Sequence, residues 1–217
     1  MSSPDFTTVV RERAPRLDEM ALALAAEFAP VDESGALEAL DHLGRKLSAV
    51  AGGDPASETR ACARFLGEEH GFAGNREDYD HPDNSMLDRV LDRRCGLPIL
   101  LSTVYVEVAR RAGVPLAGVG LPGHFVAAHF GADPPLILDP FNGGAPLAAD
   151  APPEIVRPWG AHETALRMLN NLVASYSRRG DLTRAIRAAQ MRLQLPVEEA
   201  ARVGLRGELI AMQARLN

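Results

Sequence analysis

The most constraining feature of this sequence is a segment, 98–111, that is apolar on nearly every side. Pro98 suits the first turn of a helix, because proline lacks the N–H that would stay unpaired there. Gly113 and Pro115 then stop the helix. Its apolar residues do not keep to one face; they are Ile99, Leu100, Leu101, Val104, Val106 and Val108. A helix with this pattern is buried on most sides, so the rest of the chain is expected to surround it.

Three short segments with β propensity follow this helix, at residues 119–121, 125–130 and 136–138. Glycine and proline residues separate them, as in the turns between antiparallel strands. A helix packed against a small antiparallel sheet defines an α+β fold. We therefore predict an α+β core that has a central buried helix and a small antiparallel sheet.

Helical patterns flank this core on both sides. Apolar residues recur at three- and four-residue spacing before it, and near the C-terminus they form two stripes separated by a turn at 179–181. We predict three parts: an N-terminal helical region (1–74), the α+β core (75–158), and a C-terminal helical hairpin with a third helix (159–217). A segment rich in proline and alanine, 146–158, precedes the last part.

Composition and charge narrow the partners and the compartment. The 217 residues are 46% hydrophobic and carry a net charge of −6, with acidic and basic residues interspersed. Because no lysine- or arginine-rich run occurs, we expect neither nucleic acid nor a membrane as partner. Two cysteines, Cys62 and Cys95, are too few for a disulfide framework, which favours a reducing, cytoplasmic location. The apolar segment 20–29 is interrupted by Glu27 and is interpreted as a helix face rather than a secretion signal.

His124 and Asp139 form the clearest chemical pattern. His124 follows a Pro-Gly turn at the start of a predicted strand, and Asp139 ends the next predicted strand. Thiol acyl-transfer enzymes use a histidine, oriented by a carboxylate, to stabilise a cysteine thiolate. The alternative interpretation is structural, with a histidine satisfied by a hydrogen bond and an aspartate in a turn.

The separation of these two side chains depends on the register of their strands. Direct pairing of His124 with Asp139 would centre the turn between Gly131 and Ala132 and bring the two Cβ atoms to roughly 4.5–5.5 Å. A turn centred on Asp133 would instead shift the register by about three residues. The sequence is compatible with both registers.

A metal site would be a competing use of the histidines. His124 and His129 are five residues apart, so on one regular strand they face opposite sides of the sheet. The chain has neither a His-x-x-x-His nor a Cys-x-x-Cys motif. We therefore expect no metal ion and no cofactor.

Several segments together resemble the SirB-type transglutaminase-like proteins. They are VLDRR at 90–94, GLPILLS at 96–102, GVGLPGHF at 118–125, LDPF at 138–141 and LRMLNNL at 166–172. This resemblance implies a transglutaminase/papain-like α+β core followed by tetratricopeptide-like helices. It also implies a site derived from the Cys-His-Asp triad of acyl-transfer enzymes.

The resemblance assigns the triad one residue at a time. It places the histidine at His124 and the aspartate at Asp139. The cysteine of an active member begins the central helix, a position that counting back from Gly113 assigns to Pro98. SirB-type relatives characteristically carry proline there as well. Proline has no nucleophile, so the resemblance implies that thiol catalysis is lost.

Two neighbouring residues are candidate substitutes for the nucleophile. Cys95 lies three residues before Pro98, and three residues of extended chain span roughly 10 Å. Ser102 lies one turn beyond Pro98, about 6 Å along the helix axis, and its hydroxyl is expected to bond to its own helix. Cys95 is the one we retain, with a small buried residue near a helix end as its structural alternative.

Further residues are predicted to line a cleft beside the pair. They are Pro98, Ser102, Asn84, Arg94 and Phe141. Arg93 and Glu107 are further candidates for this site. Glu107 lies in an otherwise apolar helix, where a carboxylate is costly unless it is paired, and a solvated face is the alternative.

Three functions are compatible with these residues. The preferred one is a transglutaminase-like module that lacks thiol catalysis and binds a protein or peptide. The second is an active amide hydrolase or transamidase that uses Cys95 with His124 and Asp139. The third is a scaffold whose C-terminal helices recruit a partner. The pattern indicates no oligomeric state.

Overall fold

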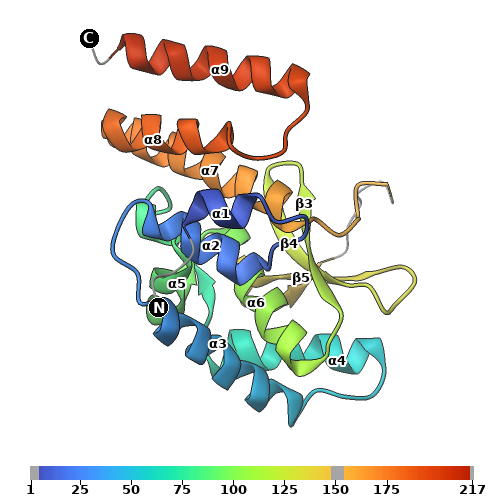
Figure 1. Cartoon of the computed structure of the whole chain (residues 1–217). Coiled ribbons are helices and arrows are strands. Elements are labelled where there is room, and N and C mark those ends of the chain that lie inside the picture. Colours follow the sequence, from blue (N-terminus) through green and yellow to red (C-terminus); the bar gives the residue numbers. More distant parts are fainter. Residues whose placement is uncertain (1–4, 148–153, 216–217) are drawn as a thin grey trace.

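The computed structural model describes residues 5–147 and 154–215 and has the predicted helix at its centre (Figure 1). This helix, α6 (Pro98–Ala112), carries Pro98 in its first turn and ends at Gly113, whose φ of +79° is left-handed. Leu101 and Val104 within it are fully buried. The buried central helix is therefore confirmed.

An antiparallel sheet with the strand order β3-β4-β5-β6 lies against α6. Its strands are β3 (Leu116–Leu121), β4 (His124–His129), β5 (Leu136–Asp139) and β6 (Ala145–Pro146). Pro122 and Gly123 form the two-residue turn between β3 and β4, where Gly123 takes a φ of +71° that favours glycine. The three predicted strands are confirmed, and the structure adds β6.

The register between β4 and β5 differs from the direct pairing of His124 with Asp139. Ala127 pairs with Leu138, and continuing this register places Asp139 opposite Val126. The direct pairing is therefore wrong by two residues. Because a shift of two residues keeps both side chains on one face of the sheet, they can still meet along the diagonal.

Five helical elements come from the described residues of the first third of the chain. They are α1 (Phe6–Val10), α2 (Leu17–Ala26), α3 (Glu33–Ser48), α4 (Pro55–Cys62) and the π-helical turn η1 (Ala63–Glu69). Helix α3 packs along α6, whereas α2 contacts α5, α6 and α7. The apolar segment 20–29 supplies buried residues of α2, in agreement with its interpretation as a helix face.

Two short strands join distant segments at the start of α6. Strand β1 (Ala73–Gly74) pairs in parallel with β2 (Cys95–Gly96). Between them the chain forms the 3-10 turn η2 (Pro82–Ser85) and helix α5 (Leu87–Arg93). The sequence did not predict this pair, because strands of two residues show no alternation of apolar and polar positions.

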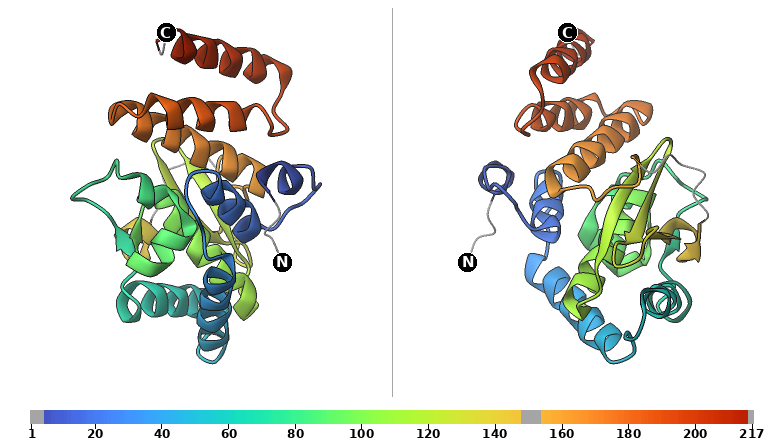
Figure 2. Two further views of the ribbon diagram at one scale, coloured as in Figure 1. Left: turned by 60° about the vertical axis from the view of Figure 1, so that its left-hand side comes forward. Right: turned by 90° about the vertical axis from the view of Figure 1, so that its right-hand side faces the viewer.

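Three helices form the C-terminal part: α7 (Ala161–Arg178), α8 (Leu182–Arg192) and α9 (Glu199–Ala214). The turn predicted at 179–181 joins α7 and α8 into the expected hairpin. Figure 2 shows the three helices stacked on one side of the molecule, with α9 outermost.

One hydrophobic core unites the three predicted parts of the chain. Leu40, Leu101 and Leu169 belong to the same buried cluster, although each comes from a different part. The division at residues 74 and 158 therefore stays a prediction about sequence segments. Residues 148–153 of the linker predicted at 146–158 lie outside the described residues.

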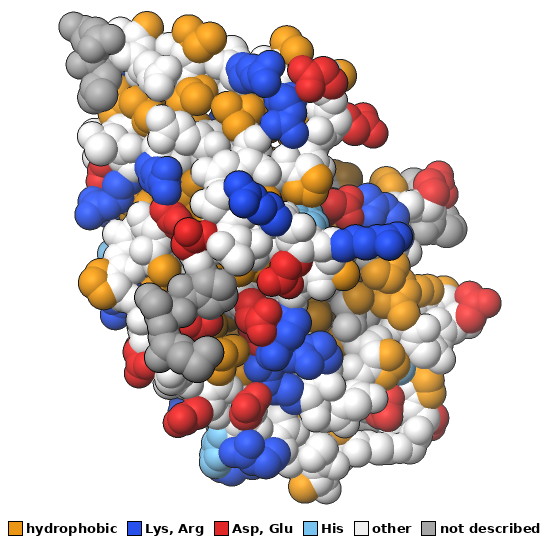
Figure 3. All heavy atoms as spheres, viewed as in Figure 1, with side chains coloured by type: hydrophobic (Ala, Val, Ile, Leu, Met, Phe, Trp, Pro, Cys, Tyr) orange, Lys and Arg blue, Asp and Glu red, His pale blue; other side chains and the backbone are white. Residues whose placement is uncertain are grey.

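The architecture of helices around a small sheet confirms the α+β fold class. Basic and acidic side chains alternate over the face drawn in Figure 3, as the interspersed charges of the sequence indicate. Among the described residues, no helix has both the length and the apolar character that a membrane crossing requires.

Candidate functional site

His124 and Asp139 meet as a close pair at ion-pair distance. The His124 Nε2 atom lies 3.0 Å from Asp139 Oδ2, with 28% of the His124 side chain and 6% of the Asp139 side chain exposed. In the described part of the chain, no group bonds to His124 Nδ1. If Nε2 carries the shared proton, Nδ1 is an unprotonated acceptor on the exposed side of the ring.

The Asp139 carboxylate is fixed by the turn that follows β5. Its Oδ1 accepts from the Phe141 backbone N–H at 3.0 Å, and its Oδ2 accepts from Asn142 Nδ2 at 2.6 Å. These bonds hold the short helix η3 (Pro140–Asn142) against the carboxylate. Asp139 is therefore held in a fixed position beside His124.

The backbone of His124 is held by Arg167 of α7. The Arg167 guanidinium donates to the carbonyl oxygen of Leu121 at 3.3 Å and to that of His124 at 3.0 Å. It thereby bridges both ends of the Pro-Gly turn. Residue-by-residue prediction missed Arg167, although it lies inside the segment LRMLNNL that contributed to the family resemblance.

Pro98 is the residue that the family resemblance assigned to the position of the cysteine. It is buried at the first position of α6, and the preceding Leu97 N–H donates to the Asn84 carbonyl oxygen at 2.9 Å. Ser102, one turn further on, donates to the carbonyl oxygen of Phe125, the residue after His124. The first turns of α6 therefore lie beside the start of β4, but they present no nucleophile there.

The Ser102 hydroxyl corrects one expectation. It was expected to bond to its own helix, whereas it donates across to β4, 3.4 Å from the Phe125 oxygen. Thr103, its neighbour, does bond within the helix, to the Ile99 oxygen at 2.8 Å. Ser102 is fully buried, so its contact attaches helix to sheet rather than facing a cleft.

Asn84 is fully buried and joins the segments that border the start of α6. Its Nδ2 donates to the carbonyl oxygens of Asp78 at 2.7 Å and Tyr79 at 3.1 Å. Its Oδ1 accepts from Asn75 at 3.1 Å and from Arg93 at 3.3 Å. Asn84 thus fixes the loop that places Tyr79 near the pair.

Phe141 is the residue around which the candidate site is assembled. Its ring lies edge-on to His124, with 6.4 Å between ring centroids, and edge-on to Tyr79 at 5.9 Å. The Arg76 guanidinium lies 5.2 Å from its centroid. A Cβ on Gly74 would lie only 2.3 Å from the nearest ring atom, so the glycine makes room for the ring.

Cys95 lies in β2 and is partly exposed. Its sulfur is 3.9 Å from the Arg93 guanidinium. The other cysteine, Cys62, is fully buried in α4, and burial together with nearby Glu58 raises the pKa of its thiol to about 12. Cys95 is therefore the more accessible of the two thiols.

Arg94 and Glu107 lie away from the pair. Arg94 has a left-handed φ of 55° and donates to the His70 carbonyl oxygen at 3.2 Å, where it faces α3. Glu107 is 2% exposed and pairs with Arg110 and Arg111, each at 2.8 Å. Burial and nearby Asp18 raise the pKa of Glu107. Both residues are placed outside the predicted cleft.

A second histidine on β4 makes a different pair. His129 is fully buried, and its Nε2 lies 2.8 Å from Glu58 Oε2 of α4 while its Nδ1 accepts from the Gly131 N–H at 3.1 Å. Over residues 5–147 and 154–215, no group of three His, Cys, Asp or Glu residues could hold a metal ion.

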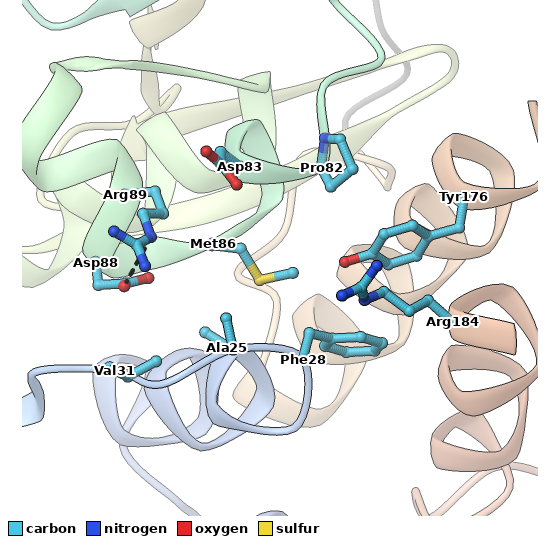
Figure 4. A pocket seen from close by; sticks show the side chains of 11 residues that line it. Ala25, Phe28, Val31, Pro82, Asp83, Met86, Asp88, Arg89, Tyr176 and Arg184 are labelled. Atoms are coloured by element: carbon cyan, nitrogen blue, oxygen red, sulfur yellow. Dashed lines mark ion pairs between the residues drawn. The ribbon is translucent and has the colours of Figure 1, made fainter. Parts of the chain in front are cut away.

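A pocket of about 290 Å³ lies elsewhere, between α2, α5 and the C-terminal hairpin (Figure 4). Phe28 stacks on Tyr176 at 5.5 Å, and Met86 lies between α2 and α7 in the same space. Burial raises the pKa of Tyr176 to about 12. No local pattern in the sequence predicts this pocket, because its lining comes from four separate segments.

A buried helix start at Pro98, with the pair of His124 and Asp139 on the adjacent sheet, is the arrangement expected from the family resemblance. The comparisons agree: residues 17–187 match the family model of the transglutaminase-like superfamily, and this chain belongs to that family.

Relatives place the chain more narrowly beside the UPF0162 proteins. A UPF0162 protein of Pseudomonas aeruginosa is 33% identical over 224 residues, which cover 94% of this chain and 82% of that protein. A UPF0162 protein of Xylella fastidiosa is 40% identical over 153 residues, or 62% of this chain and 54% of the relative. This chain thus spans about half the length of the Xylella relatives.

A shorter similarity links the chain to a human protein. F-box only protein 21 of Homo sapiens is 47% identical over 55 residues, 25% of this chain and 9% of that protein. No solved structure matches the chain.

Proposed function

We propose that this protein is a SirB-type transglutaminase-like module that binds a protein or peptide segment beside His124 and performs no thiol catalysis. One observation carries the proposal: the pair of His124 and Asp139 is intact, while the helix start beside it holds the buried Pro98. The two residues that would orient a nucleophile are present, but Pro98 has no group that could attack a carbonyl carbon.

The surroundings of the pair suit a peptide. Phe141 is half-buried and borders the His124 ring, and Tyr79, which is 48% exposed, lies against the Phe141 ring. Aromatic side chains of this kind supply much of the binding energy at peptide interfaces. His124 Nδ1 can accept a hydrogen bond from a backbone N–H of the bound segment.

The C-terminal helices extend the same binding role. Helices α7, α8 and α9 would correspond to the tetratricopeptide-like helices of the SirB type, and α7 contributes Arg167 directly to the candidate site. We therefore treat cleft and tail as one binding unit rather than as a catalytic core with an independent scaffold.

A binding assay on the purified full chain tests the proposal. Fluorescein-labelled peptide mixtures of random sequence are titrated with wild type, His124→Ala and His42→Ala, and anisotropy is recorded. His42 is an exposed histidine of α3 and is the matched control. We expect His124→Ala alone to weaken binding, by about tenfold for one lost charge-assisted or ring contact. Equal affinities of the three proteins would overturn the proposal.

The second candidate function is a cysteine-dependent amide hydrolase or transamidase. It is favoured by the contact between Cys95 and the Arg93 guanidinium. Its test is the rate of iodoacetamide labelling of Cys95 against pH. Labelling that rises well below the ordinary thiol pKa of about 8.5 supports this function, and labelling that rises only near that value excludes it. Cys62, whose thiol pKa is raised to about 12, is the internal control.

A further inference from the structure

Arginines around the candidate site divide into two groups. At the end of α7, Arg178 pairs with Asp80 and Arg179 pairs with Asp78. Arg76 and Arg167 have no carboxylate within ion-pair distance among the residues that the structure describes. These two arginines are therefore the ones beside His124 and Phe141 whose charge no described carboxylate neutralises by direct contact.

Arg167 is held in place by neutral groups only. It donates to the carbonyl oxygens of Leu121 and His124, and its guanidinium lies 5.9 Å from the ring centroid of Phe125 and 6.0 Å from that of Trp159. Burial lowers its pKa, which reflects the cost of keeping this charge partly out of water without a counter-ion. A guanidinium has five N–H donors, so donors remain for a ligand.

Arg76 lies against a different aromatic residue. Its guanidinium lies over the Phe141 ring and donates to Asn142 Oδ1. Phe141 contacts both Tyr79 and His124. Burial and nearby Asp80 raise the pKa of the Tyr79 phenol, and the charge of Arg167 opposes that rise. The Phe141 ring beside Arg76 thus contacts His124, whose carbonyl oxygen accepts from Arg167.

The carboxylates nearby leave this charge available. The Asp139 carboxylate is already paired with His124 and accepts hydrogen bonds from Asn142 and from the backbone of η3. Asp78 and Asp80 are bound by the α7 arginines. Glu77, beside Arg76 in the chain and exposed, forms no ion pair with a described residue.

We propose that Arg76, beside Phe141, and Arg167, beside His124, bind carboxylate groups of the ligand. The peptide that binds at this site is therefore an acidic one. This inference rests on the proposed peptide-binding function and names its ligand class. Arginine forms paired N–H···O bonds with carboxylates, and an aromatic floor orients the rest of the segment.

Four labelled peptide mixtures test the charge preference on the full chain by anisotropy. Three have an amidated C-terminus and differ in one fixed central residue, which is Glu, Gln or Lys. The fourth has Gln and a free C-terminal carboxylate. The variants are Arg76→Gln, Arg167→Gln, Arg167→Lys and, as control, Arg206→Gln, which removes an exposed arginine of α9. Circular dichroism confirms that each variant is folded.

We expect the Glu mixture or the free-carboxylate mixture to bind at least about fivefold more tightly than the amidated Gln mixture, and which of them does so identifies the source of the carboxylate. Arg76→Gln should weaken that binding about tenfold and Arg206→Gln should leave it unchanged. Arg167→Lys keeps the charge and should retain more affinity than Arg167→Gln. If Arg167→Gln does not fold, Arg76→Gln alone decides.

Two other outcomes separate this inference from the proposed function. Equal affinity for the amidated Glu and Gln mixtures and the free-carboxylate mixture, with all binding lost in His124→Ala, would overturn the acidic preference and leave peptide binding standing. Affinity lost equally in Arg76→Gln and Arg206→Gln would overturn the assigned arginines. Absence of binding above the His124→Ala background would overturn both.

Discussion

Strand β4 begins and ends with a histidine, and each histidine is paired with a carboxylate. His124 at its start lies 3.0 Å from Asp139, and His129 at its end lies 2.8 Å from Glu58. The N–O distances of the two pairs are nearly equal, but the exposure of the two histidines differs. His129 is 1% exposed with both ring nitrogens bonded, whereas the His124 side chain is 28% exposed with one ring nitrogen available.

This difference shows that a histidine paired with a carboxylate does not by itself define a site. At His129 the carboxylate belongs to the more exposed partner, with 22% of its side chain accessible, and the histidine is the buried one. At His124 the order is reversed, because the carboxylate is buried and orients a histidine that faces outward. Only the second arrangement can act on a ligand.

The largest effect that separates the two pairs is expected on stability. His129→Ala removes a buried ring and leaves Glu58 and the Gly131 N–H without their partner, so it should lower the free energy of unfolding by about 3 kcal/mol. His124→Ala should lower it by less than about 1 kcal/mol, since the ring is partly solvated. Urea unfolding followed by circular dichroism measures both. Equal losses would remove the distinction between a structural and a functional histidine.

The carboxylates should show the reverse order. Asp139→Ala leaves His124, Asn142 and the Phe141 N–H without an acceptor, and we expect a loss of about 2 kcal/mol. Glu58→Ala should cost about 1 kcal/mol, because its partly exposed position lets water replace it. The same urea titrations decide. A larger loss for Glu58→Ala would mean that Asp139 does not fix the turn after β5.

A glycine next to each pair offers a smaller and more local perturbation. A Cβ at Gly74 would displace the Phe141 ring, so Gly74→Ala should weaken peptide binding several-fold while costing only about 1 kcal/mol of stability. A Cβ at Gly131 would instead press on the His129 ring, 2.8 Å from its Cε1. Gly131→Ala is therefore the control for binding. If it weakens peptide binding as much, the Phe141 ring has no special part in the site.

The smallest effect is expected on the thiol. If His124 serves binding and not a cysteine, His124→Gln should change the labelling rate of Cys95 by less than about twofold at any pH between about 6 and 9. His129→Gln is the parallel variant. Cys62 should stay unlabelled in this range, since its thiol pKa is raised to about 12 and almost no thiolate forms. A large drop specific to His124→Gln would favour the catalytic alternative.

Much of the fold follows from local patterns. Helix α6 was predictable because its apolar residues surround it and because Pro98 and Gly113 mark its ends by their own backbone preferences. The turn before His124 was predictable for the same reason, since proline and glycine each suit one position of it. The pair β1 and β2 was not, because two-residue strands exist only through their partner.

The candidate site was predictable in its residue types and only partly in its contacts. His124 and Asp139 were identified from their order and from the family resemblance, but their register stayed open because the turn from 130 to 135 fixes no register locally; the structure places it two residues from direct pairing. Ser102 was expected to bond within its helix, and the approach of β4 offered it a better-placed carbonyl. Arg94 turned toward α3 because its left-handed backbone redirects the chain there.

The sequence by itself determined the central helix with Pro98 at its start and the strands that follow it, since these depend on residue type and short spacing. Tertiary structure alone decided that His124 is partly exposed while His129 is buried. It alone also decided that Arg76 and Arg167 lie near His124 and Phe141 with no ion pair to a carboxylate of the described residues. The reason is physical: burial and charge compensation depend on side chains from distant segments, and no local pattern encodes which of them arrive.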